Sequence, residues 1–230
     1  MAGNYNVKEE LDKITAGLSG LTRVLDGEAW NLSPEIQSRL SRFSEAVLEQ
    51  NLTMNLTAIT DGDEFLIKHL QDSLSLLEIA EKYGLDQVGE DRSLRFLDIG
   101  SGPGFPGLPL AIMRPDWEIV LLDSLKKRVD FLNRVIEDLG LKNVKAIHSR
   151  AEDLGRQKNY REAFDLVTAR AVASLPVLLE LTLPLVKING SFLAMKGSDD
   201  EVKEAAKACQ ILGGFYGGGV DLALPDDMGQ

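Results

Sequence analysis

Hydrophobic positions in the first third of the chain recur at the three- and four-residue spacing of amphipathic helices. Ser33 followed by Pro34 is typical of a helix start, and we expect a helix over residues 33–50. A second helix is predicted from about Asp63 to Tyr83. The first 30 residues also look helical, with a weaker pattern. Together these segments predict a helical N-terminal extension over residues 1–90.

From residue 94 onward, short apolar strands alternate with helices. The expected strands cover residues 94–99, 118–122, 144–148, 165–169 and 191–195, the last after a turn at Gly190, and the expected helices run through Pro109 to Met113, from Lys126 to Leu139 and from Leu175. This alternation implies a mostly parallel, twisted sheet with right-handed crossovers and helices on both faces. We therefore predict an α/β, Rossmann-like domain over residues 91–230, with residues 86–92 as the linker and the glycines at 213–219 in a loop.

The first predicted strand runs into a loop rich in glycine and proline, Asp98 to Gly107. Doubly wound sheets bind ligands beyond the carboxyl ends of their strands, and glycine lets the backbone approach a ligand closely. The loop contains a G-x-G-x-x-G match, the fingerprint of dinucleotide sites. However, Pro103, Pro106 and Pro109 remove three N–H donors that would cradle a pyrophosphate. The pattern therefore favours S-adenosyl-L-methionine, which carries no phosphate, over a nicotinamide dinucleotide.

Asp123 closes the second predicted strand, where a carboxylate can accept hydrogen bonds from both hydroxyls of a ribose. This position supports a ribose-containing ligand without choosing between the two cofactors.

The charge is unevenly distributed. The 230 residues carry a net charge of −11, which at first argues against a nucleic-acid binder. Residues 1–90 hold 7 basic and 16 acidic groups, a net of −9, whereas residues 92–170 hold 14 basic and 11 acidic groups, a net of +3. A local basic surface is therefore compatible with an acidic whole. The candidate contacts to RNA phosphates are Lys126, Lys127, Arg128, Arg150 and Lys196. Solvated helix positions and simple ion pairs are the alternative interpretations.

The composition also bears on location. No run approaches the roughly 18 consecutive apolar residues of a membrane span, and the first ten residues lack the pattern of a signal peptide. Cys209 is the single cysteine, so no intramolecular disulfide can form. We expect a cytoplasmic, monomeric chain with no membrane partner. Two histidines and one cysteine provide no cluster with metal-ligand spacing, so no metal is expected.

Several segments, in order from about residue 40 to residue 200, resemble the RsmG (GidB) family of bacterial 16S ribosomal RNA guanine-N7 methyltransferases. They are Asn55–Thr60, His69–Ser73, Asp98–Gly107, Leu121–Leu125 with Lys127–Val129, Ser149–Glu152, Phe164–Asp165 with Ala169–Ser174, and Met195–Gly197. The Gly-Pro-Gly-Phe-Pro-Gly loop and the Ser-Arg-Ala-Glu segment are specific to that family among methyltransferases. The resemblance implies a class I methyltransferase fold.

The resemblance also implies a ligand set. By resemblance, the loop residues Gly100, Gly102 and Phe105 lie against S-adenosylmethionine. Asp123, Ser124 and Leu125 would line its ribose, Ala151 and Glu152 would flank its adenine, and Arg170 would lie near its amino-acid part or the incoming base. The implied partner is 16S ribosomal RNA or the small ribosomal subunit. The family normally continues into a further strand and a basic tail, so we expect a shortened chain that lacks the last sheet strands.

Guanine N7 has an in-plane lone pair and no proton to remove, so its methylation needs alignment rather than a general base. The candidate residues at the reacting groups are Arg170, Asn55 and Lys196. Asn55 and Asp72 contact substrate or brace the N-terminal helices, and His69 is expected to be structural. A small-molecule methyltransferase, a nicotinamide-dependent oxidoreductase and a non-catalytic RNA-binding module remain as alternatives.

Overall fold

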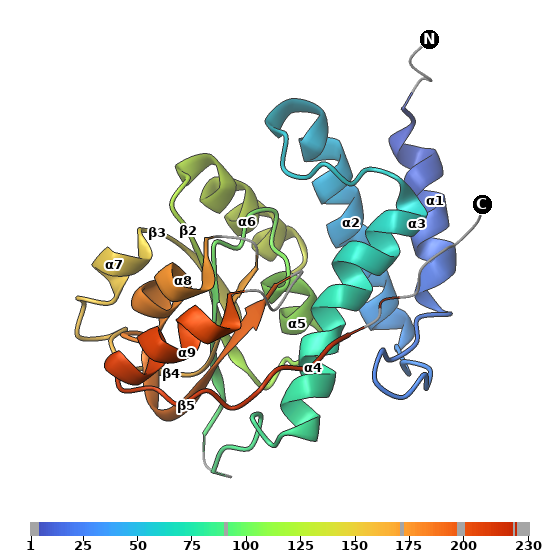
Figure 1. Ribbon diagram of the computed structural model, residues 1–230. Coiled ribbons are helices and arrows are strands. Elements are labelled where there is room, and N and C mark those ends of the chain that lie inside the picture. The colour runs from blue at the N-terminus through green and yellow to red at the C-terminus, as the bar shows by residue number, and fades with distance from the viewer. Residues whose placement is uncertain (1–4, 90–91, 171–172, 197–200, 223, 225–230) are drawn as a thin grey trace.

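The N-terminal helices lie beside a sheet that is covered by further helices (Figure 1). The computed structural model describes residues 5–89, 92–170, 173–196, 201–222 and 224. Helices α4 and α5 lie where the two parts meet (Figure 1). Among the described residues, no helix has both the length and the apolar character that a bilayer crossing requires.

The N-terminal part consists of α1 (Val7–Leu18), α2 (Pro34–Met54), α3 (Gly62–Phe65), the π-helix η1 (Leu66–Gln71) and α4 (Asp72–Lys82). The Ser33 hydroxyl caps α2 by accepting from the backbone N–H of Ile36 at 3.3 Å. The predicted second helix is present, but six of its residues form a π-helix. The expectation of helix throughout the first 30 residues is wrong beyond Leu18, because Thr22 and Ala29 form an isolated antiparallel bridge.

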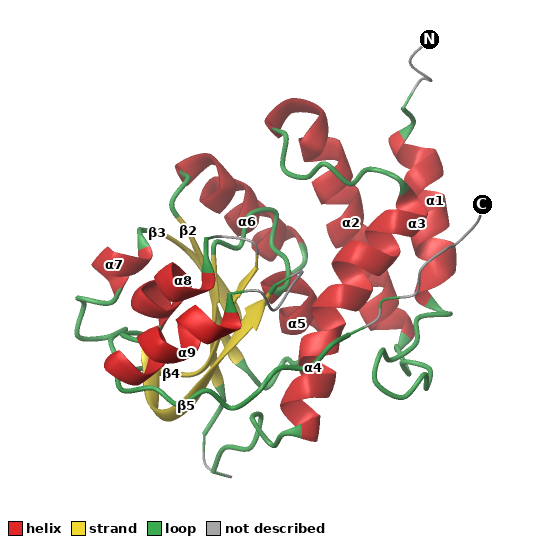
Figure 2. Ribbon diagram, in the orientation of Figure 1, coloured by secondary structure: helices red, strands yellow, loops and turns green. Residues whose placement is uncertain are grey.

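The sheet, yellow in Figure 2, lies among the helices of the α/β part. It has five parallel strands in the order β3-β2-β1-β4-β5. They are β1 (Arg95–Ile99), β2 (Glu118–Asp123), β3 (Val144–His148), β4 (Phe164–Arg170) and β5 (Val186–Met195). The connecting helices are α5 (Gly107–Met113), α6 (Lys126–Asp138), α7 (Ala151–Leu154), α8 (Leu175–Thr182) and α9 (Val202–Ile211). This confirms the Rossmann-like α/β prediction.

Alternate strand residues face different helices, as expected for a sheet buried on both sides. Phe96 packs with α5 and α6, whereas its neighbour Leu97 packs with α7 and α8. The strand order reverses between β1 and β4, which makes the carboxyl ends of these two strands the switch point where such sheets bind ligands.

Two predictions about the C-terminal half need correction. The fifth strand begins at Val186 rather than Ser191, and the predicted turn at Gly190 is a bulge within it, at a register shift opposite Phe164 and Leu166. A Cβ on Gly190 would lie 2.8 Å from the Asp165 carbonyl oxygen, so the bulge needs glycine. Helices α7 and α9 were not predicted. The glycines at 213–219 lie in a loop, as expected.

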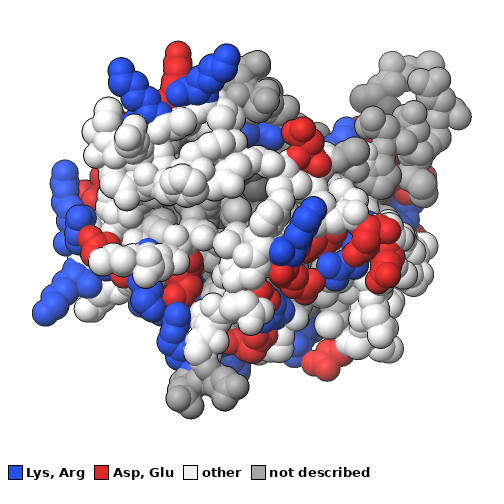
Figure 3. Space-filling model, turned by 60° about the horizontal axis from the view of Figure 1, so that its bottom comes forward, with Lys and Arg blue, Asp and Glu red and all other residues white. Residues whose placement is uncertain are grey.

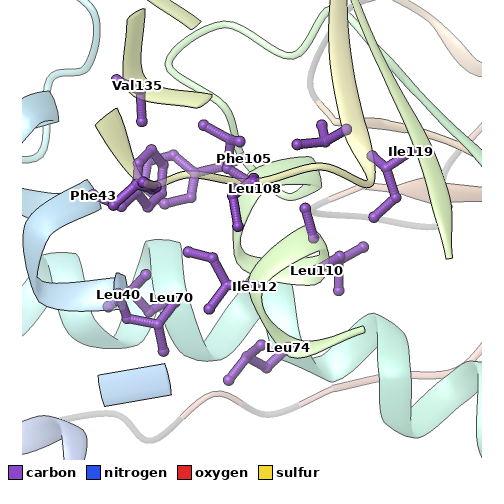
Figure 4. Packing of buried hydrophobic residues seen from close by; sticks show 14 of the residues in the cluster. Leu40, Phe43, Leu70, Leu74, Phe105, Leu108, Leu110, Ile112, Ile119 and Val135 are labelled. Carbon is purple, nitrogen blue, oxygen red and sulfur yellow. The ribbon is translucent and has the colours of Figure 1, made fainter. Parts of the chain in front are cut away.

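The hydrophobic core does not divide at residue 90. One cluster of buried side chains extends from Ile14 in α1 to Leu166 in β4. Figure 4 shows Phe43 of α2 against Phe105 of the loop after β1, with Leu70 of η1 nearby. Residues 90–91 lie outside the described residues, so the boundary between residues 90 and 91 remains a prediction.

Candidate active site

The loop between β1 and α5 depends on glycines with left-handed backbone conformations. Gly100, Gly102 and Gly104 have φ angles of 73°, 55° and 112°. Residues with a Cβ rarely adopt these backbone angles, which explains why glycine occupies the three positions. The loop is fixed to the end of β2 because the Gly100 N–H donates to the Leu122 carbonyl oxygen at 2.7 Å.

Gly107 is required for lack of space rather than for φ. A Cβ there would lie 2.1 Å from Leu121 Cδ2 and 2.9 Å from Asp98 Oδ2. Its N–H donates to Asp98 Oδ2 at 3.1 Å. Asp98 is fully buried, and its Oδ1 has no hydrogen-bond partner among the described residues. Burial raises the pKa of Asp98 to about 7. Asp98 therefore lies under the loop as a carboxyl group that can hold a proton near neutrality.

Asp123 at the end of β2 connects the loop to the next strand. Its Oδ2 accepts from the Gly102 N–H at 3.0 Å, and its Oδ1 accepts from the Leu125 N–H at 2.8 Å. Arg128 Nη1 lies 3.5 Å from Oδ2. A carboxylate has about four lone-pair positions, so these contacts do not exhaust its capacity to accept hydrogen bonds.

The predicted ribose and adenine residues lie on the adjacent ends of β2 and β3. Ser124 and Leu125 are exposed. The Ser149 N–H donates to the Asp123 carbonyl oxygen at 3.3 Å, which joins the two strand ends. Ala151 is buried at the start of α7, and Glu152 beside it is exposed. The structure thus brings Asp123, Ser124, Leu125, Ala151 and Glu152 to one edge of the sheet.

The ring of Phe105 packs into the N-terminal helices and is 2% exposed. Its centroid lies 5.0 Å from that of Phe43 and 5.5 Å from that of Phe65. It stacks on the His69 imidazole, with centroids 4.4 Å apart and an interplanar angle of 9°. The ring therefore connects the loop to the N-terminal part, and a contact between Phe105 and cofactor remains a prediction.

Arg170 ends β4 at the switch point, and the N-terminal part holds its guanidinium. Nη1 donates to Asp72 Oδ2 at 3.1 Å and to the Lys68 carbonyl oxygen at 3.4 Å. Nη2 lies 3.4 Å from His69 Nδ1, and the guanidinium carbon lies 5.5 Å from the Phe105 ring centroid. Burial raises the pKa of Asp72, and Arg170 opposes this shift. The site thus combines β-strand ends with the segment Lys68–Asp72.

The other two candidates for the reacting groups lie on different elements, after β5 and at the end of α2. Lys196 directly follows Met195, the register partner of Arg170 on β5. Its amine pairs with Glu201 at 3.1 Å and donates to the Ala173 carbonyl oxygen at 3.1 Å. Asn55 is exposed and ends α2 in the left-handed region, with φ 49° and ψ 56°.

The basic candidates differ in their surroundings. Lys126 pairs with Asp130 at 2.7 Å, and Arg128 pairs with Asp123. Lys127 and Arg150 are exposed, the latter directly before α7. The face drawn in Figure 3 shows basic and acidic side chains interspersed with uncharged areas. Two hollows near the amino ends of the strands, around Arg92 and Arg114, contain none of the predicted site residues.

Residues 36–216 match the family model GidB, described as rRNA small subunit methyltransferase G. This range covers more than half of the chain and includes every predicted site residue. The chain belongs to the GidB family.

Curated relatives agree with this assignment. The chain is 45% identical over 196 residues to the ribosomal RNA small subunit methyltransferase G of Acetivibrio thermocellus, covering 85% of this chain and 77% of that protein. It is 49% identical over 185 residues to the protein of the same name from Clostridium botulinum (strain Eklund 17B / Type B), covering 80% and 74%. A crystal structure of a SAM dependent methyltransferase from Aquifex aeolicus is 14% identical, with coverage of 69% and 86% and a TM-score of 0.47.

Sequence reasoning missed two features of this GidB-family site. It singled out Asp123 but not the burial of Asp98, although an acidic residue inside an apolar strand is a readable signal. It also described His69 and Asp72 separately, without their common contact to Arg170. Their spacing of three residues on a helix indicates a shared face. Their common partner Arg170 lies 98 residues from Asp72 and 101 from His69, and this contact became visible only in the structure.

Proposed function

We propose that this chain transfers a methyl group from S-adenosylmethionine to N7 of a guanosine in 16S ribosomal RNA. Family membership supports the reaction class. The observation that carries the proposal is the position of Arg170 beside the glycine loop, at the carboxyl edge of the sheet and against the segment Lys68–Asp72. The glycine loop and Arg170, the candidate group for orienting the base, therefore lie together at the switch point of the sheet.

The residues at this edge fit S-adenosylmethionine. Gly100 and Gly102 provide backbone that can approach the ligand closely, and the buried Asp98 Oδ1 has no partner among the described residues. We assign the ribose to Asp123, Ser124 and Leu125, and the adenine to Ala151 and Glu152. When bound, the cofactor supplies an electrophilic methyl group on a sulfonium. The loop, including Phe105, provides its fixed position.

The chain's own residues then have to align the acceptor. Guanine N7 already carries its lone pair, so the task is close, in-line approach in a site with little freedom. We assign Arg170 to orient the incoming base or the amino-acid part of the cofactor, since guanidinium groups offer several donors in fixed directions. Asn55 and Lys196 are the further candidates beside the base. Lys196 would exchange its ion pair with Glu201 for a contact to the RNA.

The RNA backbone is assigned to Lys126, Lys127, Arg128, Arg150 and Lys196. Lys127 and Arg150 are exposed near the ends of β2 and β3, where phosphates would pass the cofactor site. Arg128 would retain its role beside Asp123. The local excess of basic groups at residues 92–170 supports binding to RNA or the small ribosomal subunit. We assign this function to a monomer in the cytoplasm.

The decisive experiment measures tritium transfer from labelled cofactor to ribosomal RNA and to small subunits, followed by mapping of the labelled nucleotide. Wild type is expected to label one guanosine. Arg170→Ala is expected to fold and to lose about 100-fold or more in transfer rate, because a misaligned reactant costs this much. Arg39→Ala, on α2 and paired with Glu35, is the matched control and should retain its rate. Normal turnover by Arg170→Ala would refute the assignment.

A small-molecule methyltransferase is the second candidate, and the net charge of −11 favours it. Activity on a free metabolite with no label in RNA would establish that alternative. Calorimetry with NAD and S-adenosylmethionine side by side tests the oxidoreductase, since NAD binding alone would contradict a methyltransferase.

A further inference from the structure

His69 lies at the point where three separate segments meet. It belongs to η1, a six-residue π-helix, and it is 6% exposed. π-helical turns are rare and occur frequently at functional sites. The imidazole contacts Thr57 of the segment after α2, Phe105 of the glycine loop and Arg170 of β4. The His69 side chain therefore contacts both the glycine loop and the end of β4.

The two nitrogens of the imidazole have different partners, and these partners fix the proton. Nδ1 faces Arg170 Nη2 at 3.4 Å, and a guanidinium can only donate. Nδ1 must therefore be the unprotonated acceptor. Nε2 then carries the hydrogen and donates to Thr57 Oγ1 at 2.8 Å. Thr57 Oγ1 also accepts from the Ile59 N–H at 3.0 Å, so its two lone pairs are both used.

Burial and the positive charge of Arg170 keep the His69 ring neutral. Arg170 on β4 faces Nδ1, and Asp72 on α4 pairs with Arg170, whereas the Lys68 ammonium pairs with Glu64. Burial first, and Arg170 second, lower the pKa of His69 to about 3. The ring is therefore a hydrogen-bond acceptor throughout the range in which an ordinary histidine titrates.

We propose that His69 is a positioning residue whose Nδ1 accepts from the guanidinium of Arg170 and holds it at the carboxyl end of β4, beside the glycine loop. The Asp72 carboxylate supplies the opposite charge, and the His69 ring supplies the direction and the surface that stacks on Phe105. The N-terminal helices thereby take part in alignment of the reactants. This proposal rests on the function proposed above for Arg170.

Nitrogen-15 NMR of histidine-labelled protein tests the proton position without any turnover. The chain has two histidines, and a His148→Gln variant assigns their signals. We expect the Nε2–H tautomer of His69 from pH 8 down to pH 5, and a shift of the Nδ1 signal in Arg170→Met, which cannot donate. An Nδ1–H tautomer, or protonation near pH 6.5, would overturn the proposal.

Kinetics of matched variants test the role. His69→Phe keeps an aromatic ring against Phe105 and removes the acceptor, whereas His69→Asn restores a carbonyl oxygen near the position of Nδ1. We expect His69→Phe to lower kcat by about 10- to 100-fold, with KM for S-adenosylmethionine and affinity for S-adenosylhomocysteine little changed. His69→Asn should recover part of kcat, and Thr57→Val should lower it less than His69→Phe does.

The outcomes separate the two proposals. Unchanged kcat in His69→Phe, or equal losses of kcat, cofactor affinity and thermal stability in every variant, would show a merely structural histidine. A wild-type enzyme that labels no ribosomal RNA would refute the proposed function, while the NMR measurement would still decide whether His69 directs Arg170.

Discussion

Asp98 and Asp123 are both buried acidic residues at the ligand end of the sheet, but their environments differ. Both oxygens of Asp123 accept backbone N–H groups, whereas only one oxygen of Asp98 has a partner among the described residues. A buried carboxylate without full hydrogen bonding is unstable as an ion, so Asp98 retains its proton to a higher pH. The sequence position identified Asp123, and the apolar neighbours of Asp98 could have indicated its burial, but the hydrogen-bond partners of both carboxylates can be read only from the structure.

This environment predicts a pH-dependent stability. The pKa of Asp98 is 3.8 as a free group and about 7 in the folded chain, so the folded state binds more protons between these values. The resulting stabilisation is complete below about pH 4 and is lost as the pH rises through 7. We expect Asp98→Asn, which mimics the protonated form, to remove this part of the slope, worth at most about 4 kcal/mol. Urea unfolding between pH 4 and pH 8 measures the change in the free energy of unfolding. If the free energy of unfolding of wild type and variant depended on pH with the same slope, the raised pKa of Asp98 would be contradicted.

The space around Gly107 predicts a second residue-level effect. A methyl group there would collide with Leu121 and with Asp98, both in the buried sheet. We expect Gly107→Ala to lower the free energy of unfolding by about 1–3 kcal/mol and to weaken S-adenosylhomocysteine binding. Gly89→Ala is the control, since nothing lies within 4 Å of its Cβ position. Chemical denaturation and calorimetry measure both quantities, and equal stability of the two variants would show that the loop yields freely.

At the scale of elements, the strands of the core were predictable and the finer helical detail was not. Apolar runs bounded by turns located all five strands, although the bulge at Gly190 concealed the first half of β5. Apolar spacing continues from α3 through η1 into α4, so nothing in the periodicity marks the π-helical turn. Helix α7 has only four residues, too few to show a helical period, and α9 buries only two small side chains, Ala205 and Cys209.

The end of α2 allows a clean test of Asn55. This residue has φ 49°, a conformation that glycine adopts without strain. We therefore expect Asn55→Gly to leave the free energy of unfolding within about 0.5 kcal/mol of wild type. If the side chain contacts the base, as proposed, methyl transfer should fall about tenfold or more, the loss expected for about one hydrogen bond to substrate. Single-turnover transfer assays measure this, and an unchanged rate would leave Asn55 with the role of a helix terminus.

At the scale of the whole molecule, charge and topology jointly indicate where RNA would bind. The carboxyl edge of the sheet carries Lys127 and Arg150, whereas Lys142 lies before β3 at the opposite edge. Fold class and reaction class could be predicted because they depend on strand–helix alternation and on local motifs. The contact of the N-terminal helices with the glycine loop could not be predicted, because side-chain packing joins residues there that are far apart in the sequence.

The charge arrangement predicts a salt effect. Each lysine or arginine that neutralises a phosphate adds roughly 0.7–0.9 to the slope of log affinity against log salt. We expect Lys127→Ala combined with Arg150→Ala to reduce that slope by about 1.5, with S-adenosylhomocysteine binding unchanged. Lys142→Ala should leave the slope as in wild type. Filter binding of 16S RNA between 50 and 200 mM salt measures this, and equal slopes for both variants would move the RNA to another surface.

Phe105 belongs to the loop of the α/β part, yet its ring lies among Phe43, Phe65 and His69 of the N-terminal part. A chimera that takes residues 1–90 from one relative and the rest from another would therefore combine Phe43, Phe65 and His69 of one parent with Phe105 of the other. Such hybrids between distant relatives should express poorly unless all four aromatic positions come from the same parent. In evolution, the same dependence would cause these helices and the cofactor loop to be inherited as one unit.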